Sequence, residues 1–209
     1  MTSRDIVLAR IRSANAAATH GAPPSEPEVP RAYRVRGEHS PGTSELLDLL
    51  TGRLVDYRAG VHRCPTAAVP EVIAGVLPRT ARLIVPSGLP DGWAPAGAVT
   101  DDGSLDPTAL DAFDAVLTGC AAAVAETGTI ALDGSAGQGR RAISLVPDRH
   151  VCVVRADQVV QTVPELLARL DPRRPLTLVS GPSATSDIEL QRVEGVHGPR
   201  TLTVIIATG

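Results

Sequence analysis

The sequence contains no lysine, and this absence removes several kinds of chemistry. All 20 basic residues of the 209-residue chain are arginine. A Schiff-base lysine, a phosphate-loop lysine and a lysine-activated serine are therefore excluded. The formal net charge is −3, and no basic run is longer than the pairs Arg140-Arg141 and Arg173-Arg174. With so few basic and aromatic side chains gathered together, nucleic-acid binding has little support.

Aromatic residues are also scarce, at 2% of the chain, whereas hydrophobic residues make up 43%. The core must therefore be built from valine, leucine, isoleucine and alanine. Such a composition favours a buried parallel sheet covered by alanine-rich helices.

Cysteine is the third scarce residue. Cys64, Cys120 and Cys152 form no CxxC pair, so neither a disulfide framework nor a cysteine-bound iron–sulfur cofactor is expected in this chain. No segment has the continuous apolar character of a signal peptide or a membrane span. We therefore predict a cytoplasmic protein with no cofactor of its own.

The chain divides at a proline-rich stretch. Residues 3–18 are predicted to form a helix, and residues 20–42 contain five prolines, which is typical of an extended linker. Residues 1–42 are thus interpreted as an N-terminal helix and linker, and residues 43–209 as one α/β domain.

Within that domain, helical and extended patterns alternate. Helices are expected over residues 43–57, 66–77, 106–113 and 157–170, and strands over 60–64, 81–85, 98–100, 115–117, 121–125, 129–132, 150–154, 176–180 and 201–207. This alternation predicts a three-layer α/β/α fold around a doubly wound, mostly parallel sheet. Ligands of such sheets bind beyond the carboxyl ends of the strands.

Three blocks of the C-terminal half resemble the lactate utilization protein C family, whose domain is called the LUD domain. They are Ala125-Glu-Thr-Gly-Thr-Ile130, Ser144-Leu-Val-Pro-Asp-Arg-His150, and Ser180-Gly-Pro-Ser-Ala-Thr-Ser-Asp-Ile-Glu189 with Val196-His-Gly-Pro-Arg200. The sequence departs from the common form of the family at Ala184, where arginine is frequent. The resemblance implies a fold like that of glucosamine-phosphate isomerases, ribose-phosphate isomerases and coenzyme A transferases. It also implies a role, with iron–sulfur partner proteins, in oxidising L-lactate to pyruvate.

Glu126 is the first candidate catalytic residue. It lies at a turn between two apolar strands, where burial can raise the pKa of a carboxylate toward acid–base work. Coenzyme A transferases of the related fold use a glutamate nucleophile before a similar turn. The alternative is that Glu126 only holds the turn through backbone N–H groups. Its neighbours Thr127, Gly128 and Thr129 can either contact a ligand carboxylate or serve as turn residues.

The second candidate segment contains small hydroxyl residues after a predicted strand. Ser180, Gly181, Ser183, Thr185 and Asp187 can form an anion-binding nest, or can simply cap a helical turn. Glu189 is a weaker candidate.

Two further candidates follow in the next loop. His197 lies between glycines and can exchange a proton with a substrate, or can pin the loop through hydrogen bonds. Arg200 can bind a substrate carboxylate, or can pair with Glu189 or Glu194.

Two His-x-Cys pairs raise the question of a metal. His62 and Cys64 share one face of a predicted strand, as do His150 and Cys152, and four such ligands could hold zinc if the strands were neighbours. Any strand places residues i and i+2 on one face, so no metal site is assigned. The glycine-rich residues 134–139 resemble a phosphate loop only in glycine content, and a flexible lid or disordered hairpin is expected.

The leading hypothesis is a component of an L-lactate utilization system that binds a small organic acid or a partner subunit and has no redox centre of its own. The alternative is a stand-alone enzyme of the coenzyme A transferase or sugar-phosphate isomerase type that uses Glu126. A third hypothesis is a scaffold that grips a partner through residues 3–42. Catalysis by this chain and formation of a homo-oligomer are left open.

Overall fold

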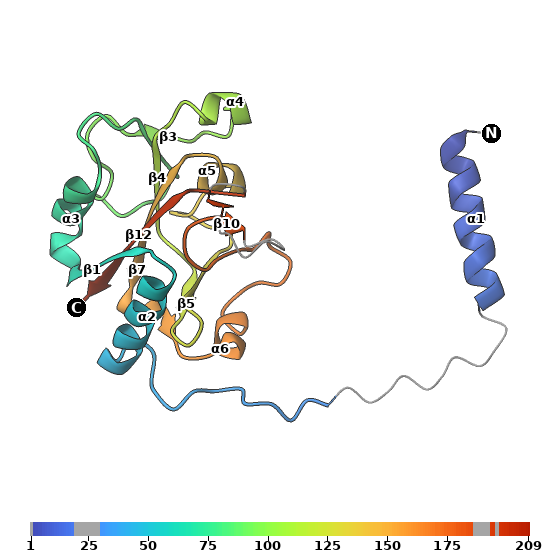
Figure 1. Ribbon diagram of the computed structural model, residues 1–209, viewed down its shortest axis with the longest axis horizontal. Coiled ribbons are helices and arrows are strands. Elements are labelled where there is room, and N and C mark those ends of the chain that lie inside the picture. Colours follow the sequence, from blue (N-terminus) through green and yellow to red (C-terminus); the bar gives the residue numbers. More distant parts are fainter. Residues whose placement is uncertain (1, 19–29, 186–192, 195–196) are drawn as a thin grey trace. The chain divides into compact units, whose positions relative to one another are not determined.

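The computed structural model describes residues 2–18, 30–185, 193–194 and 197–209. The chain separates into two compact units, residues 1–33 and 34–209. The first unit contains helix α1 (Ser3–Ala18), which confirms the helix predicted there. The second unit contains the α/β fold (Figure 1). Among the described residues, no helix is long and apolar enough to cross a membrane.

The centre of the second unit is a six-stranded sheet in which every pair of neighbours is parallel. Its strands, in spatial order, are β1 (Gly60–Pro65), β12 (Thr201–Thr208), β7 (Arg149–Arg155), β4 (Ala115–Thr118), β2 (Leu83–Val85) and β3 (Val99–Thr100). This arrangement confirms the predicted mostly parallel α/β fold. The helices are α2 (Ser44–Asp56), α3 (Val69–Val76), α4 (Pro107–Leu110), α5 (Arg141–Leu145) and α6 (Val163–Leu167), with 3-10 turns η1 (Thr66–Ala68) and η2 (Ala156–Gln158).

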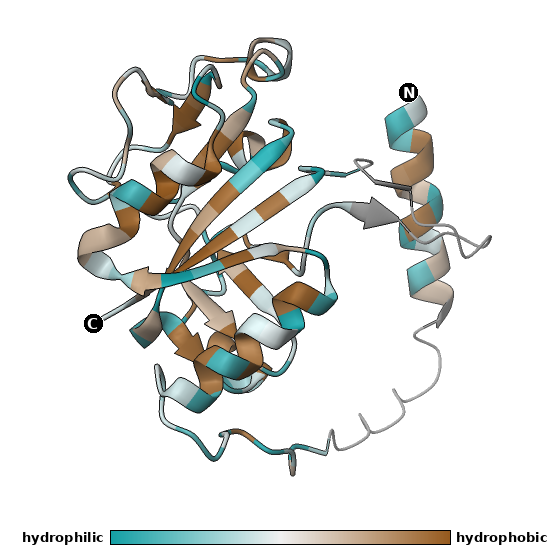
Figure 2. Cartoon of the chain, turned by 60° about the vertical axis from the view of Figure 1, so that its left-hand side comes forward, coloured by the Kyte–Doolittle hydropathy of each residue, from teal (hydrophilic) through white to brown (hydrophobic). Residues whose placement is uncertain are grey.

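The four inner strands, β12, β7, β4 and β2, are buried over most of their length and are mainly apolar, whereas the edge strands β1 and β3 are mostly exposed (Figure 2). In β7, Val151 and Val153 pack in one hydrophobic cluster with α3. The alternate residues Cys152 and Val154 pack on the other side in a cluster with α2. The period-2 alternation of a strand thus divides the core between two layers of covering elements.

A second sheet, of four strands, covers part of the α2 side. Its spatial order is β8 (Val159–Val160), β5 (Ala122–Val124), β6 (Thr129–Leu132) and β9 (Thr177–Val179). The β5–β6 and β6–β9 pairs are antiparallel, whereas β5 and β8 are parallel. Ala123 and Ile130 face the core shared with α2, and Val124 packs with Leu166 of α6. A separate two-stranded ladder joins β10 (Ala184–Thr185) to β11 (Val193–Glu194).

The helix predicted over residues 157–170 is wrong in extent. Val159 and Val160 form strand β8 because pairing with β5 buries both β-branched side chains. The helix begins only after Thr162, whose hydroxyl accepts a bond from the backbone N–H of Glu165 while the glutamate reaches back to the N–H of Thr162. This capping box fixes the start of α6 and limits it to residues 163–167. Helix α5 was not predicted at all.

The end of the predicted linker packs on the α/β unit. The N–H groups of Glu38 and His39 donate to Oε1 of Gln161, at 2.7 and 3.0 Å, and Gly42 N–H donates to the carbonyl of Val159 at 3.1 Å. We call residues 34–42 the strap. It is part of the second unit, and its bonds to Gln161 and Val159 fit an extended segment that lies over the surface.

Candidate functional site

Glu126 lies at the tip of the β5–β6 hairpin, as the sequence indicated. Its side chain forms an ion pair with Arg34 and accepts a hydrogen bond from Nε2 of Gln161 at 3.1 Å. Its backbone carbonyl accepts a hydrogen bond from Nε of Arg53 at 3.0 Å. The carboxylate is therefore held between the strap and the residue after β8, and it lines none of the cavities described below.

Three predicted hydroxyl residues meet in a short chain of hydrogen bonds. Oγ1 of Thr127 lies 2.8 Å from Oγ1 of Thr129, which lies 2.9 Å from Oγ of Ser180. Two glycines, Gly128 and Gly181, allow the turns that carry these hydroxyl groups to pack closely against the end of α2. Both have positive φ, and a Cβ at Gly128 would come within 2.8 Å of Arg53 Cβ, while one at Gly181 would come within 2.6 Å of Tyr57 Cβ. The hairpin tip and the Ser180 turn thus both dock on the end of α2.

The Ser180–Ser183 turn and the His197–Pro199 loop are tied together by Ser183. Its N–H donates to the carbonyl of Pro199 at 2.8 Å, and its hydroxyl accepts from the N–H of His197 at 3.0 Å. These two loops line a cavity of about 220 Å³ that we call the serine cavity. His150 and Leu202, near the amino ends of β7 and β12, lie at its base.

His150 is the buried titratable group of the serine cavity. Its Nε2 lies 2.7 Å from the hydroxyl of Thr118, and its side chain is almost entirely buried. Burial lowers the pKa of His150 to about 4. The imidazole is therefore neutral at neutral pH, with one ring nitrogen that donates and one that accepts.

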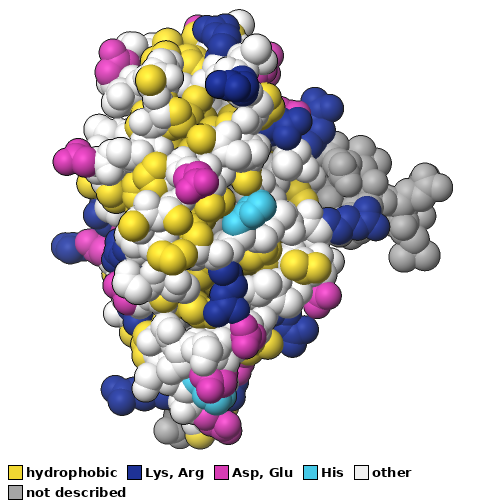
Figure 3. All heavy atoms as spheres, turned by 90° about the vertical axis from the view of Figure 1, so that its left-hand side faces the viewer, with side chains coloured by type: hydrophobic (Ala, Val, Ile, Leu, Met, Phe, Trp, Pro, Cys, Tyr) yellow, Lys and Arg dark blue, Asp and Glu magenta, His cyan; other side chains and the backbone are white. Residues whose placement is uncertain are grey.

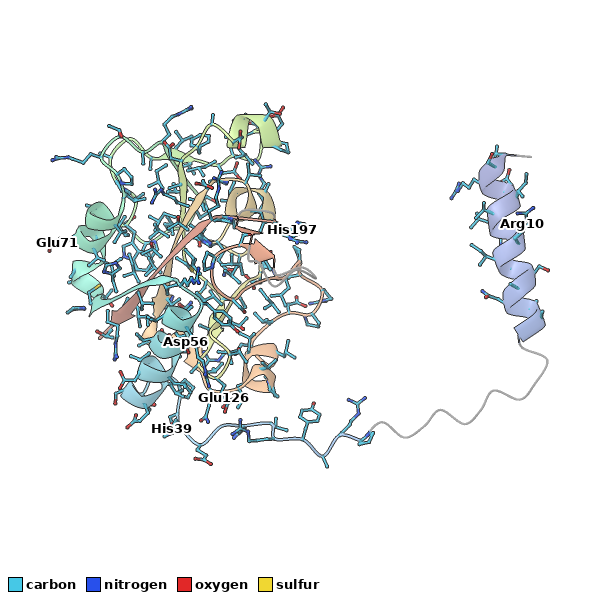
Figure 4. All side chains as sticks on the ribbon, in the orientation of Figure 1. Arg10, His39, Asp56, Glu71, Glu126 and His197 are labelled. Atoms are coloured by element: carbon cyan, nitrogen blue, oxygen red, sulfur yellow. The ribbon has the colours of Figure 1, made fainter. Side chains whose placement is uncertain are left out.

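The structure separates the two candidate catalytic residues. Figure 4 shows Glu126 beside the strap and His197 well away from it, near β10. Glu126 and His197 therefore do not share a site in this chain. Ser180 belongs both to the hydroxyl chain near Glu126 and to the lining of the serine cavity near His197.

The remaining predicted residues have other settings. Nε of Arg200 lies 2.8 Å from Oδ1 of Asp148, so its ion pair is with a residue that the sequence did not suggest. Thr185 lies in β10 and pairs with Val193 of β11. Asp187 and Glu189 lie outside the described residues.

The two His-x-Cys pairs are not neighbours, because β12 lies between β1 and β7. His62 is exposed, whereas Cys64, His150 and Cys152 are buried. Over the described part of the chain, no three histidine, cysteine or acidic side chains come together as metal ligands would.

Comparison with known proteins places the chain in a family. The sequence pattern of the LUD domain matches residues 96–207. A protein of Deinococcus radiodurans named lactate utilization protein C is 50% identical over 188 residues, covering 87% of this chain and 88% of that one. The chain belongs to the lactate utilization protein C family. A second protein of that name, from an Exiguobacterium species, is 28% identical and covers 86% of both chains.

A solved structure supports the same placement within the LUD domain family. The crystal structure of a DUF162 family protein from Deinococcus radiodurans superposes with a TM-score of 0.69 at 45% identity. It covers 79% of this chain and 98% of that one. The matched LUD domain, residues 96–207, contains the Glu126 hairpin and both loops of the serine cavity.

The α/β unit also contains a larger cavity that the sequence did not reveal. It has a volume of about 610 Å³ and lies where β2 and β3 end, beside Ser87 and Asp101. Its wall includes residues 133–136, part of the glycine-rich loop that was expected to be a flexible lid or disordered hairpin. The loop makes hydrogen bonds from Gly137 N–H to the carbonyl of Ser87 and from Gly119 N–H to the carbonyl of Gly137, at 2.8 and 2.7 Å. We call this space the arginine cavity, because Arg140, Arg141 and Arg174 line it.

Two arginine pairs noted in the sequence contribute residues to the arginine cavity. Arg140-Arg141 and Arg173-Arg174 are visible in the sequence, but nothing there indicates that one member of the second pair meets both members of the first.

Proposed function

We propose that this chain is a component of an L-lactate utilization system, in which it binds a small organic acid at the serine cavity. Iron–sulfur partner proteins supply the electron transfer that oxidises lactate to pyruvate. The names of the Deinococcus and Exiguobacterium relatives support the assignment to lactate utilization. The single observation that carries the binding site is the convergence of two motif loops on one cavity through Ser183.

The chemistry of the serine cavity suits a small hydroxy or keto acid. The hydroxyl of Ser183 accepts from His197 N–H, so its own proton is free to donate to a ligand oxygen. Ser180 adds a second hydroxyl, and neutral His150 lies at the base. The imidazole of His197 is exposed at the rim, where it can exchange a proton with a bound acid. At about 220 Å³, the cavity is below the usual size for a drug-sized ligand.

The placement of the cysteines supports a redox centre in partner chains. Cys64 packs on the α3 side of the six-stranded sheet, whereas Cys120 and Cys152 pack on the α2 side. All three are buried. Iron–sulfur clusters of the common type are held by four thiolates around one centre, whereas these three cysteines lie on two sides of the sheet.

The alternative function is a stand-alone coenzyme A transferase- or isomerase-like enzyme with Glu126 as nucleophile or base. A nucleophile must reach a substrate, whereas Glu126 is engaged by Arg34 and Gln161 and borders no described cavity. This geometry favours the role of Glu126 in holding the strap. The chain can also act by binding a partner protein instead of an acid. The pull-down and the acid titration described below distinguish these two roles.

The decisive experiment is growth of a deletion strain on L-lactate. We expect the deletion to abolish growth on L-lactate and the wild-type gene to restore it. Normal growth of the deletion strain would refute the role in lactate utilization. Anaerobic pull-down of the tagged chain, scored for iron–sulfur proteins, tests the partners.

Acid binding is tested separately on the purified chain. Titration with pyruvate and with L-lactate, followed by NMR, should show saturable shifts that Ser183→Ala weakens by about ten-fold, since a charge-assisted hydrogen bond contributes about 1.5–3 kcal/mol. Ser104→Ala is the matched control, because Ser104 bonds only to Asp102 on an exposed loop. If neither acid binds while the deletion abolishes growth and partners are captured, the chain acts through partner binding.

A further inference from the structure

We propose that the arginine cavity is a second ligand site, which binds an organic oxyanion larger than the acid of the serine cavity. The charged group faces Arg141 and Arg174, and the body of the ligand lies against Pro86, Leu132 and Pro175. The cavity lies at the carboxyl ends of β2 and β3, where open parallel sheets bind their ligands. The serine cavity, which shares Ser144 and Thr177 with the arginine cavity, lies near the start of β7 and β12.

The three arginines of the cavity are bound to different degrees. Arg140 donates from Nε and Nη2 to the two oxygens of Asp101, at 2.8 and 2.9 Å, and from Nη2 to the carbonyl of Leu105 at 2.7 Å. These bonds lower the pKa of Asp101 and raise that of Arg140. This pair is a fixed, neutral part of the wall.

Arg174 is held only loosely. Its Nη1 lies 4.0 Å from Oδ2 of Asp133, and Oδ1 of that carboxylate already accepts bonds from the N–H and hydroxyl of Ser135. The guanidinium therefore keeps most of its donors free for another oxyanion.

The guanidinium of Arg141 has no hydrogen bond or ion pair with any described residue, although Arg141 lines the cavity and its backbone carbonyl accepts a bond from the hydroxyl of Ser144. The lining contains three arginines and two aspartates, which leaves one positive charge in excess. A free planar guanidinium that shares a cavity with a second, loosely held one is suited to bidentate binding of a carboxylate or phosphate.

The wall also contains an unsatisfied polar group. Thr177 is 7% exposed, and its hydroxyl has no hydrogen-bond partner among the described residues. Buried hydroxyls in folded proteins are normally hydrogen-bonded, so an isolated one at a cavity indicates a missing partner. Thr177 lines both cavities, so a ligand oxygen in the arginine cavity can supply that partner.

Size and polarity point to an organic ligand rather than a bare inorganic ion. The volume of about 610 Å³ falls within the range of about 300–1,000 Å³ that small-molecule sites occupy. The apolar side chains of Pro86, Leu132 and Pro175 offer contact to a hydrocarbon or ring body. Carboxylates and phosphate esters share the chemistry that the arginines recognise, and the experiment distinguishes them.

The test uses three probes with one aromatic ring. Phenyl phosphate and benzoate carry two different oxyanions, and benzyl alcohol carries none. Calorimetric titration of the full chain at low salt should show saturable binding of at least one anion and none of benzyl alcohol. The stronger of the two anions identifies the ligand as a phosphate ester or a carboxylate.

Matched variants locate the binding. Arg141→Ala and Arg174→Ala should each lower the affinity for the anion about ten-fold, as expected for a lost charge-assisted hydrogen bond. Arg173→Ala should leave binding unchanged, because Arg173 pairs with Asp171 and does not line the cavity. Circular dichroism checks that each variant is folded. If an alanine variant does not fold, the glutamine variant of the same arginine is used in its place.

Several results would overturn the proposal. They are the binding of neither anion by the wild-type chain, equal binding of benzyl alcohol, wild-type affinity in the Arg141 and Arg174 variants, or an equal loss in Arg173→Ala. The proposed lactate role can fail independently, because Ser183→Ala should weaken pyruvate binding while leaving the probe anion bound.

Discussion

Gln161 donates a hydrogen bond from Nε2 to Oε1 of Glu126, over 3.1 Å, and through its own Oε1 holds two backbone N–H groups of the strap. One buried amide thus links the hairpin tip to the strap, whose bonded residues lie 122 and 123 positions before Gln161. The carboxylate of Glu126 also pairs with Arg34 of the same strap, so this motif residue helps to hold the strap on the α/β unit.

Removing this amide should loosen the strap. Gln161→Ala leaves two N–H groups and the Glu126 carboxylate without that partner, so the free energy of unfolding should fall by about 1–3 kcal/mol. Urea denaturation measures it. In a double-mutant cycle with Glu126→Ala, we expect a coupling of about 0.5–3 kcal/mol. Additive effects would show that the two side chains are energetically independent.

Substituting Glu126 separates the two candidate functions. Glu126→Gln keeps the size of the side chain and can still bond to Gln161, so we expect growth on L-lactate to be retained. Glu71→Gln, an exposed glutamate on α3, is the control (Figure 4). A loss of growth in Glu126→Gln alone, with normal folding, would instead favour the enzyme with a glutamate nucleophile or base.

The docking of the Ser180 turn on α2 depends on Gly181. Gly181→Ala combines a positive φ with a Cβ 2.6 Å from Tyr57 Cβ, whereas Gly92→Ala has a similar φ and open space around it. The left-handed conformation costs about 1–2 kcal/mol at either position. Steric overlap should add about 1–3 kcal/mol at Gly181 alone. Equal loss of stability in the two variants, measured by urea denaturation, would contradict this packing.

His150 should make stability fall as the pH is lowered. Its pKa is about 4 in the folded chain and about 6.5 when unfolded, so below pH 6.5 only the unfolded state takes up the proton. Stability is fully present above pH 6.5 and is lost as the pH falls toward 4, by up to about 3 kcal/mol.

The pH experiment compares two histidine variants. His150→Gln should remove this part of the pH dependence, whereas His62→Gln, at an exposed residue, should retain it. Urea denaturation between pH 4 and 7 gives the free energies. Parallel curves for wild type and His150→Gln would show that burial does not hold this imidazole neutral.

The face of the α/β unit that Figure 3 shows has a mixed surface. On the face that α2 and α3 present, apolar, arginine and acidic side chains are interspersed (Figure 3). The described charged side chains therefore form no single patch on that face.

Local patterns in the sequence were enough to predict most elements. The valine- and isoleucine-rich runs of β7 and β12, the leucine repeat of α2 and the β5–β6 turn depend on neighbours within a few residues. The pattern failed over residues 157–170, where pairing of β8 with the distant β5 outweighed a local helical pattern. It also missed α5, a single short turn held by tertiary packing of Ile143.

The sequence by itself determined the family, the parallel α/β class and the motif residues, because these depend on residue types and short spacings. Only the tertiary structure decided that β12 separates β1 from β7, that Glu126 meets Arg34 and Gln161 rather than His197, and that Arg174 joins Arg141 in one cavity. These contacts join residues far apart in the chain. Their partners are selected by sheet order and packing, which spacing along one sequence does not record.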